Sequence, residues 1–166
     1  IDPDGRDEWE VNESGFIVKH IANDKIDAFH MVDSKGNRID GKSIEFKHGT
    51  VLGRLSYNKK FKDGADKSID LFAVKGSKNG EALHQFFTQN TNVEFARFDM
   101  KKGNNEINVI GTSHDTGKDY SSSDIKDYLT KIGGLGLLLI FDHNHPDDYA
   151  MPSGFEKDDK NGDKFF

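Results

Sequence analysis

The order of the apolar segments constrains the fold of this chain more than any other feature of its sequence. In residues 79–88, Ala, Leu and Phe recur at helical spacing, which predicts an amphipathic helix. Residues 93–98 and 106–112 flank a Lys-Lys-Gly-Asn turn and have strand character, so together they predict a β-hairpin. A second amphipathic helix is predicted over residues 125–132, and it leads directly into an apolar run over 135–141.

This succession of helix, hairpin, helix and strand predicts the α+β class, as an α/β sandwich in which a mixed β-sheet is flanked by helices. The run 135–141 is apolar throughout, so we interpret it as a strand buried on both faces. Short β segments and turns over residues 15–55 predict an N-terminal antiparallel β-meander. The polar, Lys-rich residues 57–67 are expected to form a solvated loop.

The length and the apolar content of the chain predict one main domain with a shorter leader. The chain has 166 residues, of which 34% are hydrophobic and 13 are Phe, enough to fill a core. A charged start punctuated by Pro and Gly predicts a junction over residues 1–12. We expect a β-rich segment over residues 13–68 to pack on a main domain over 69–166.

Composition excludes several kinds of site. The chain has no Cys, so disulfides, cysteine nucleophiles and thiolate zinc sites are excluded, and a metal would need His and carboxylate ligands. The formal net charge of −6 argues against a nucleic-acid partner, because such binding depends on Lys and Arg that neutralise phosphates. No apolar run approaches the length of a membrane span, so we expect a soluble protein without one.

Two histidines at the end of the apolar run form the candidate metal site. Side chains at i and i+2 of an extended segment point to the same side, so His143 and His145 can converge while Asn144 points away. Zinc is the default choice for imidazole ligands. The alternative reading of a bare His-x-His pair is two polar surface residues.

The residues around this pair resemble a known signature. His143-x-His145-Pro146, followed by Pro152-Ser153, resembles the His-x-His-Pro…Ser-x-x-Asp signature of the JAB/MPN (JAMM) zinc metallopeptidases. The Asn-Thr-Asn-Val-Glu-Phe run over 90–95 and Gly-Thr-Ser-His over 111–114 resemble JAB-like toxin domains at the C-termini of RHS-type polymorphic toxins. The resemblance covers roughly residues 71–163, and its family fold is JAB/MPN-like.

The resemblance implies a zinc-dependent peptidase or isopeptidase that hydrolyses an amide bond with a metal-activated water. His143 and His145 would be neutral ligands to Zn²⁺, Glu94 the general acid/base, and Ser153 a hydrogen-bond donor to the oxyanion. Each catalytic candidate also has a structural reading. Glu94 can be a solvated strand residue, and Ser153 can cap a helix in which Glu156 completes a capping box.

The third metal ligand is the point at which this chain departs from the signature. The pattern Ser-x-x-Asp would place Asp at the position that Glu156 occupies. Glu156 can replace it, Asp158 or Asp159 can serve, or residues 154–162 can be an insertion before Asp163. We favour Asp163, because JAB-like toxins carry Pro-Ser-Gly, a variable loop and then Gly-Asp.

The resemblance also implies a setting and partners. Residues 1–6 resemble the end of an RHS core, and the chain begins at Ile1 rather than Met. We therefore expect the C-terminal part of a larger toxin, secreted or delivered into a target cell, with a protein or peptide substrate and a cognate immunity protein. Two alternatives are a metal-dependent nuclease toxin of the His-Me finger class, suggested by Asp142-His143, and a non-catalytic JAB-fold binding module.

Overall fold

The structure, a computed structural model, describes residues 7–133 and 136–146 and has two β-sheets and two helices in this part of the chain. The four-stranded sheet contains, in spatial order, β2 (Ile17–Ala22), β1 (Asp7–Val11), β3 (Ile26–Val32) and β4 (Arg38–Lys47). The five-stranded sheet contains β5 (Val51–Lys60), β6 (Asp66–Lys75), β8 (Asn105–Thr112), β7 (Ala96–Lys102) and β9 (Leu137–His143). The helices are α1 (Ser77–Asn90) and α2 (Ser122–Lys131).

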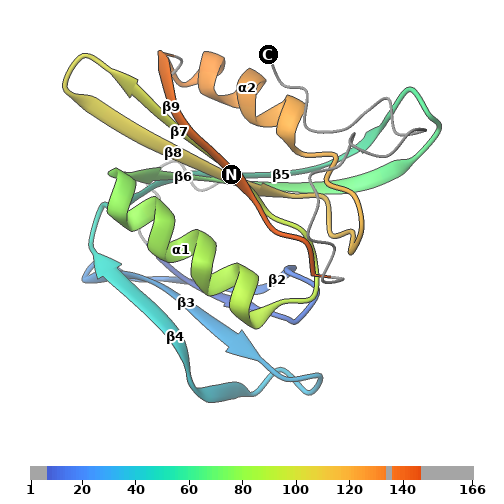
Figure 1. Cartoon of the computed structure of the whole chain (residues 1–166). Helices are drawn as coiled ribbons and strands as arrows, with labels where there is room; N and C mark the ends of the chain where they lie inside the picture. The colour runs from blue at the N-terminus through green and yellow to red at the C-terminus, as the bar shows by residue number, and fades with distance from the viewer. Residues whose placement is uncertain (1–6, 134–135, 147–166) are drawn as a thin grey trace.

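The predicted α+β class is confirmed, and the elements form layers (Figure 1). Helix α1 lies between the two sheets, and α2 covers the opposite face of the five-stranded sheet. Both helices and the β7–β8 hairpin occur where the sequence predicts them, because their periodicities and turn residues are local signals. Within the described residues, no helix has the length and apolar character that a membrane crossing requires.

The N-cap residue of helix α2 is Ser121, which belongs to the Ser-rich run before the helix. The Ser121 side chain makes no capping bond to the helix backbone. The carboxylate of Asp119 instead accepts hydrogen bonds from the backbone N–H groups of Ser121 (3.0 Å) and Ser122 (3.1 Å). A carboxylate at this end satisfies exposed N–H groups and opposes the positive end of the helix dipole.

Aromatic residues join both sheets through α1. The rings of Trp9 and Phe29 in the four-stranded sheet stack at 4.8 Å, and Phe29 meets Phe72 of β6 edge-on at 5.3 Å. Phe87 of α1 packs 5.3 Å from Phe29 and 4.7 Å from Phe95, which lies just before β7. Trp9, Phe29, Phe87 and Phe95 are fully buried, so one core fixes α1 and the start of β7 against both sheets.

The N-terminal strands do not form the predicted meander. In a meander, β2 would pair with β3, but β1 lies between them, antiparallel to β2 and parallel to β3. The apolar side chains of β1, Trp9 and Val11, are fully buried, which explains the preference for a central position. A strand order of this kind depends on tertiary burial and leaves no local pattern in the sequence.

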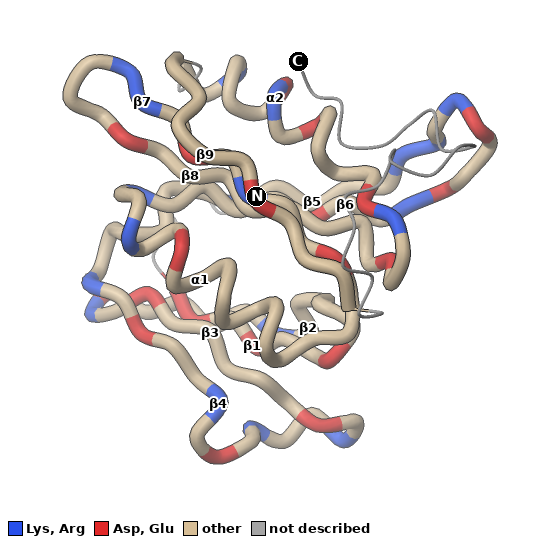
Figure 2. Tube along the Cα trace, in the orientation of Figure 1, with Lys and Arg blue, Asp and Glu red and all other residues tan. Residues whose placement is uncertain are grey.

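The predicted loop over residues 57–67 is wrong, because most of it extends the β5–β6 hairpin. The pairing continues from Val51↔Val74 to Lys60↔Asp66, and Gly64 turns the chain with φ +88°. Figure 2 shows Lys/Arg and Asp/Glu side by side at the tip of this hairpin. The residues are polar because the tip extends into solvent, and the polarity hid a regular pair of strands.

Strand β9 is also less buried than its apolar sequence predicts. It lies at the end of the five-stranded sheet and pairs with β7 on one side. Leu138 and Phe141 pack against the core beneath α2, whereas Leu137 is 67% exposed and Leu139 43% exposed. The prediction of a strand is confirmed, and that of burial on both faces is wrong, since several apolar side chains of β9 are exposed.

Candidate functional site

The register between β7 and β9 brings the two predicted halves of the site together. Ala96 pairs with His143 in this antiparallel ladder, so the next positions outward place Glu94 opposite His145. The Oε1 atom of Glu94 lies 3.3 Å from Nδ1 of His145, and Glu94 is buried at 4% exposure. Residues that are 51 positions apart in the sequence therefore share one site.

The two imidazole rings converge on each other. Nε2 of His143 and Nε2 of His145 are 2.8 Å apart and share a hydrogen bond, with the rings close to perpendicular at 83°. One of the two nitrogens must donate a proton and the other must accept it. The carboxylate of Glu94 lies at the opposite nitrogen of His145, which favours the tautomer that carries its proton on Nδ1.

Asn144 holds the Glu94 segment in place, a role that the sequence does not reveal. Its Oδ1 accepts a hydrogen bond from the backbone N–H of Phe95 (2.6 Å), and its Nδ2 donates to the carbonyl of Val93 (3.2 Å). These bonds flank Glu94 on both sides. The amide side chain thus continues the β7–β9 pairing by one more step beyond the last ladder residues.

The backbone of Glu94 is fixed on its other side by residues at and after the end of β8. The N–H of Glu94 donates to the carbonyl of Asp115 (2.7 Å), and its carbonyl accepts from the hydroxyl of Thr112 (2.7 Å). Both polar backbone groups are satisfied, so the carboxylate stands on a rigid segment.

Replacement of Asn144 with Ala is expected to destabilise the protein by about 1–3 kcal/mol, because the Phe95 N–H and the Val93 carbonyl lose their partners. Urea denaturation followed by circular dichroism measures this effect. Gln89→Ala, which removes an amide from the exposed surface of α1, is the matched control and should change the free energy of unfolding by less than about 0.5 kcal/mol. Equal stabilities of the Asn144 variant and the wild type would contradict the role of Asn144 in holding the Glu94 segment.

Two further side chains support the site from inside the fold. Arg97 of β7 is buried and donates through its guanidinium to Asp142, the residue before His143, and to Asn108 (3.0 Å). His84 of α1 bonds through Nε2 to the carbonyl of Phe95 (3.1 Å). Burial lowers the pKa of His84 below its ordinary value, so at neutral pH it is a neutral donor to that carbonyl.

Sequence reasoning missed Arg97 and His84. The structure pairs Arg97 with Asp142, the residue that precedes the first histidine of the candidate pair. Arg97 is one of two charged residues, with Glu94, in the hairpin strand 93–98, and this was the available signal for it. No comparable signal exists for His84, since it lies on the buried side of a helix with an ordinary pattern.

The remaining predicted site residues lie outside the described part of the chain. These are Ser153 and the candidate third ligands Glu156, Asp158, Asp159 and Asp163. Among residues 7–133 and 136–146, no three His, Asp or Glu side chains are grouped so that they could hold a metal ion. The described residues supply a pair of imidazoles and one nearby carboxylate.

The chemistry of this donor pair fits zinc. Neutral imidazole nitrogen is a preferred zinc ligand, with bonds of about 2.0–2.1 Å. At tetrahedral angles such bonds separate two nitrogens by about 3.3 Å, whereas the Nε2 atoms of His143 and His145 are 2.8 Å apart. The two Nε2 atoms would therefore have to move about 0.5 Å farther apart to take the ligand separation.

Comparison with protein-family models assigns the chain to a family. The family model described as JAB-like toxin 1 matches residues 72–166, more than half of the chain. The matched range includes Glu94, His143 and His145. No curated protein and no solved structure matches the chain.

Proposed function

The chain belongs to the JAB-like toxin family, and from this membership we propose that it is a zinc-dependent peptidase or isopeptidase domain of a delivered toxin. The observation that carries the proposal is the β7–β9 register, which places the buried Glu94 carboxylate against His145 and beside His143. Burial of a charge is costly, and the buried Glu94 carboxylate lies beside an imidazole pair rather than in solvent.

His143 and His145 are the proposed zinc ligands. Zinc bound there would act as a Lewis acid and lower the pKa of a coordinated water to about 7. The proton in the hydrogen bond between the two Nε2 atoms must move, for example to the Nδ1 atom of the same ring, before both Nε2 atoms can donate lone pairs to a cation. Protons compete with the cation for these lone pairs, so zinc binding is expected to weaken as the pH falls.

Glu94 is the proposed general acid and base. Its carboxylate can accept a proton from attacking water and return it to the leaving amine of the cleaved amide bond. The fixed backbone of Glu94 and its contact with His145 keep the carboxylate in reach of the site. We further propose that Ser153 donates to the oxyanion and that Asp163 completes the ligand set, with Glu156 and Asp158 as alternatives.

The partners follow from the family. A toxin domain needs a target, which we propose to be a protein or peptide, and a cognate immunity protein that protects the producing cell. Delivery as the C-terminal part of a larger, RHS-type toxin is part of the same proposal.

Removal of one imidazole tests the metal centre. We expect wild-type protein dialysed against zinc to retain about one ion per chain, and His143→Ala to bind zinc at least about 100-fold more weakly. Inductively coupled plasma mass spectrometry and competition with a chromophoric chelator give both values. His20→Ala, which removes a partly exposed imidazole from the four-stranded sheet, is the control and should bind zinc like the wild type. Identical zinc binding by all three proteins would refute the proposed zinc site.

A further inference from the structure

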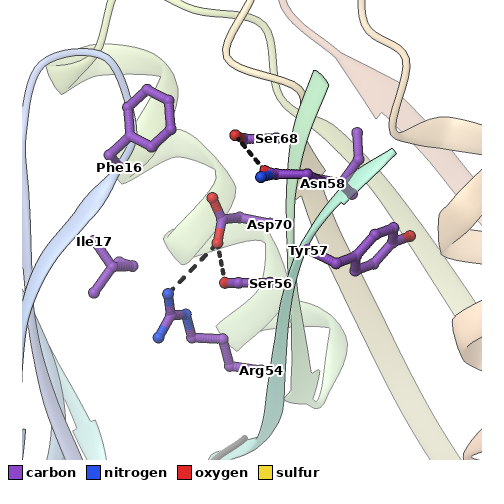
Figure 3. Close-up of a pocket in the computed structure, with 9 residues that line it drawn as sticks. Phe16, Ile17, Arg54, Ser56, Tyr57, Asn58, Ser68 and Asp70 are labelled. Atoms are coloured by element: carbon purple, nitrogen blue, oxygen red, sulfur yellow. Dashed lines mark hydrogen bonds and ion pairs between the residues drawn. The ribbon is translucent and has the colours of Figure 1, made fainter. Parts of the chain in front are cut away.

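A polar pocket that includes none of the candidate zinc-site residues lies between the start of β2 and the β5–β6 hairpin (Figure 3). Its volume is about 330 Å³, within the range of small-molecule sites. The residues that define its chemistry are Phe16, Ile17, Arg54, Ser56, Asn58 and Asp70. All of its lining residues precede residue 72, so the pocket lies outside the range that the JAB-like family matches.

The carboxylate of Asp70, at the base of the pocket, already has two close polar partners. It accepts a hydrogen bond from the Ser56 hydroxyl and lies 2.6 Å from Nε2 of His114, the second residue after β8. Burial alone would raise the pKa of Asp70, but the bonds from His114 and Ser56 outweigh it and hold the pKa below its ordinary value. Asp70 is therefore ionised at neutral pH and can only accept.

His114 is held by acceptors at both of its ring nitrogens. Its Nδ1 lies 2.6 Å from the carbonyl of Ser14, and its Nε2 lies 2.6 Å from the carboxylate of Asp70. These two contacts fix the orientation of the ring. His114 also has a left-handed backbone with φ 61°, which is rare outside Gly and is tolerated here because the ring is held on both sides.

The guanidinium of Arg54 has no close partner at Nε and only a distant one at Nη2. Its Nη2 is 3.5 Å from Asp70, beyond ordinary hydrogen-bond length. Its Nε is buried and has no hydrogen-bond partner among the described residues. His114 and Ser56 are the close partners of Asp70, so Arg54 is the cation that faces the pocket without a close anion, and its planar fork matches a carboxylate.

The wall opposite Arg54 is apolar and partly open. Figure 3 shows Phe16 and Ile17 facing Arg54 and Asp70 across the pocket. Phe16 is 37% exposed, and its ring stacks on that of His114 with centroids 3.6 Å apart, which holds it at the rim. A ligand that bonds to Arg54 would meet this aromatic surface with the rest of its body.

We propose that this pocket binds a carboxylate carried on an apolar or aromatic group, with Arg54 as the anion ligand and Phe16 and Ile17 as the apolar wall. A peptide C-terminus and a small organic acid share this chemistry. The cluster is not a nucleophilic triad, because the Ser56 hydroxyl donates to Asp70 and both nitrogens of His114 are occupied. The proposal is independent of zinc chemistry and applies to the metal-free chain.

Titrations followed by ¹H–¹⁵N NMR test the proposal on the whole chain. The probes are N-acetyl-L-phenylalanine, its neutral amide, 3-phenylpropionate, the peptide N-acetyl-Gly-Gly-Phe and inorganic phosphate. We expect each of the three carboxylates to bind at least about tenfold more tightly than the amide and than phosphate, with shifts centred on Phe16, Ile17 and Arg54. Tighter binding of the peptide than of 3-phenylpropionate would identify a peptide terminus as the source.

Substitutions test whether the charge of Arg54 causes the preference for an acid over its amide. Arg54→Gln should abolish the preference for acid over amide, and Arg54→Lys, which keeps the charge without the fork, should weaken acid binding about fivefold or more. Lys60→Gln removes one exposed positive charge from the same strand outside the pocket and should leave binding unchanged. Equal binding of acid and amide, tighter binding of phosphate, or an unchanged preference in folded Arg54→Gln would overturn the proposal.

Discussion

Replacement of Glu94 with Gln is expected to lower amide hydrolysis and toxicity by at least about 100-fold, the usual contribution of a general acid/base. Gln has the same shape and can still form hydrogen bonds at the buried position, but it cannot take up or return a proton. Because the proposed zinc ligands are unchanged, zinc content should equal that of the wild type. Survival of cells that express the variant, compared with cells that express the wild type, measures toxicity.

The control for this experiment is Glu81→Gln, which makes the same chemical change on the exposed surface of α1 and should retain full toxicity. A Glu94→Gln protein that binds zinc, folds and remains toxic would remove the peptidase mechanism. Nicking of DNA that survives the loss of Glu94 would instead favour the His-Me finger nuclease alternative. Loss of toxicity with unchanged zinc content would separate catalysis from binding.

Replacement of Phe87 with Ala is expected to lower the free energy of unfolding by about 3–5 kcal/mol, the range for a large side chain removed from a packed core. Phe87 is fully buried, and its ring contacts Phe29 of the four-stranded sheet, Phe72 of β6 and Phe95 beside Glu94. The cavity would open where α1 joins both sheets. Urea denaturation measured by Trp fluorescence reports the change, since Trp9 lies in the same cluster.

Two companion variants calibrate the result. Phe87→Leu fills most of the cavity and should cost less than Phe87→Ala, because a smaller volume is lost. Leu52→Ala, at an exposed position on β5, should change stability by less than about 0.5 kcal/mol. A cost for Phe87→Ala as small as that of Leu52→Ala would mean that the two sheets do not share this core.

The elements with strong local signals could be predicted from the sequence. Helix α1 has its apolar residues at helical spacing, and the β7–β8 hairpin has a Gly-containing turn between its strands. Both were predicted within a few residues. Such signals depend on neighbours in the chain, so they survive without any knowledge of the tertiary structure.

The arrangement of the strands could not be predicted in the same way. The insertion of β1 between β2 and β3 depends on burial of Trp9, and the edge position of β9 depends on which strands pair. A run of Leu and Ile predicts a strand but does not say whether both of its sides are covered. The polar tip of the β5–β6 hairpin concealed regular pairing for a related reason, since composition reports exposure rather than backbone conformation.

The candidate site likewise has residues that the sequence predicts and contacts that only the folded structure reveals. His143 and His145 were found from their spacing, and Glu94 from a resemblance, whereas the register that joins them belongs to the folded sheet. Asn144 was expected only to point away from the histidines, and its two bonds around Glu94 become visible only when β7 and β9 lie side by side. The choice among Glu156, Asp158 and Asp163 stays a prediction, because these residues lie outside the described part of the chain.

X-ray absorption at the zinc K-edge of the zinc-loaded protein tests the central claim most directly. The claim is that His143 and His145 hold one ion beside Glu94. The wild-type spectrum should contain two imidazole nitrogens at about 2.0–2.1 Å with oxygen ligands completing the shell, and His145→Ala should lose one of the two or the ion itself. A spectrum without imidazole scattering, or one that His145→Ala leaves unchanged, would contradict the account.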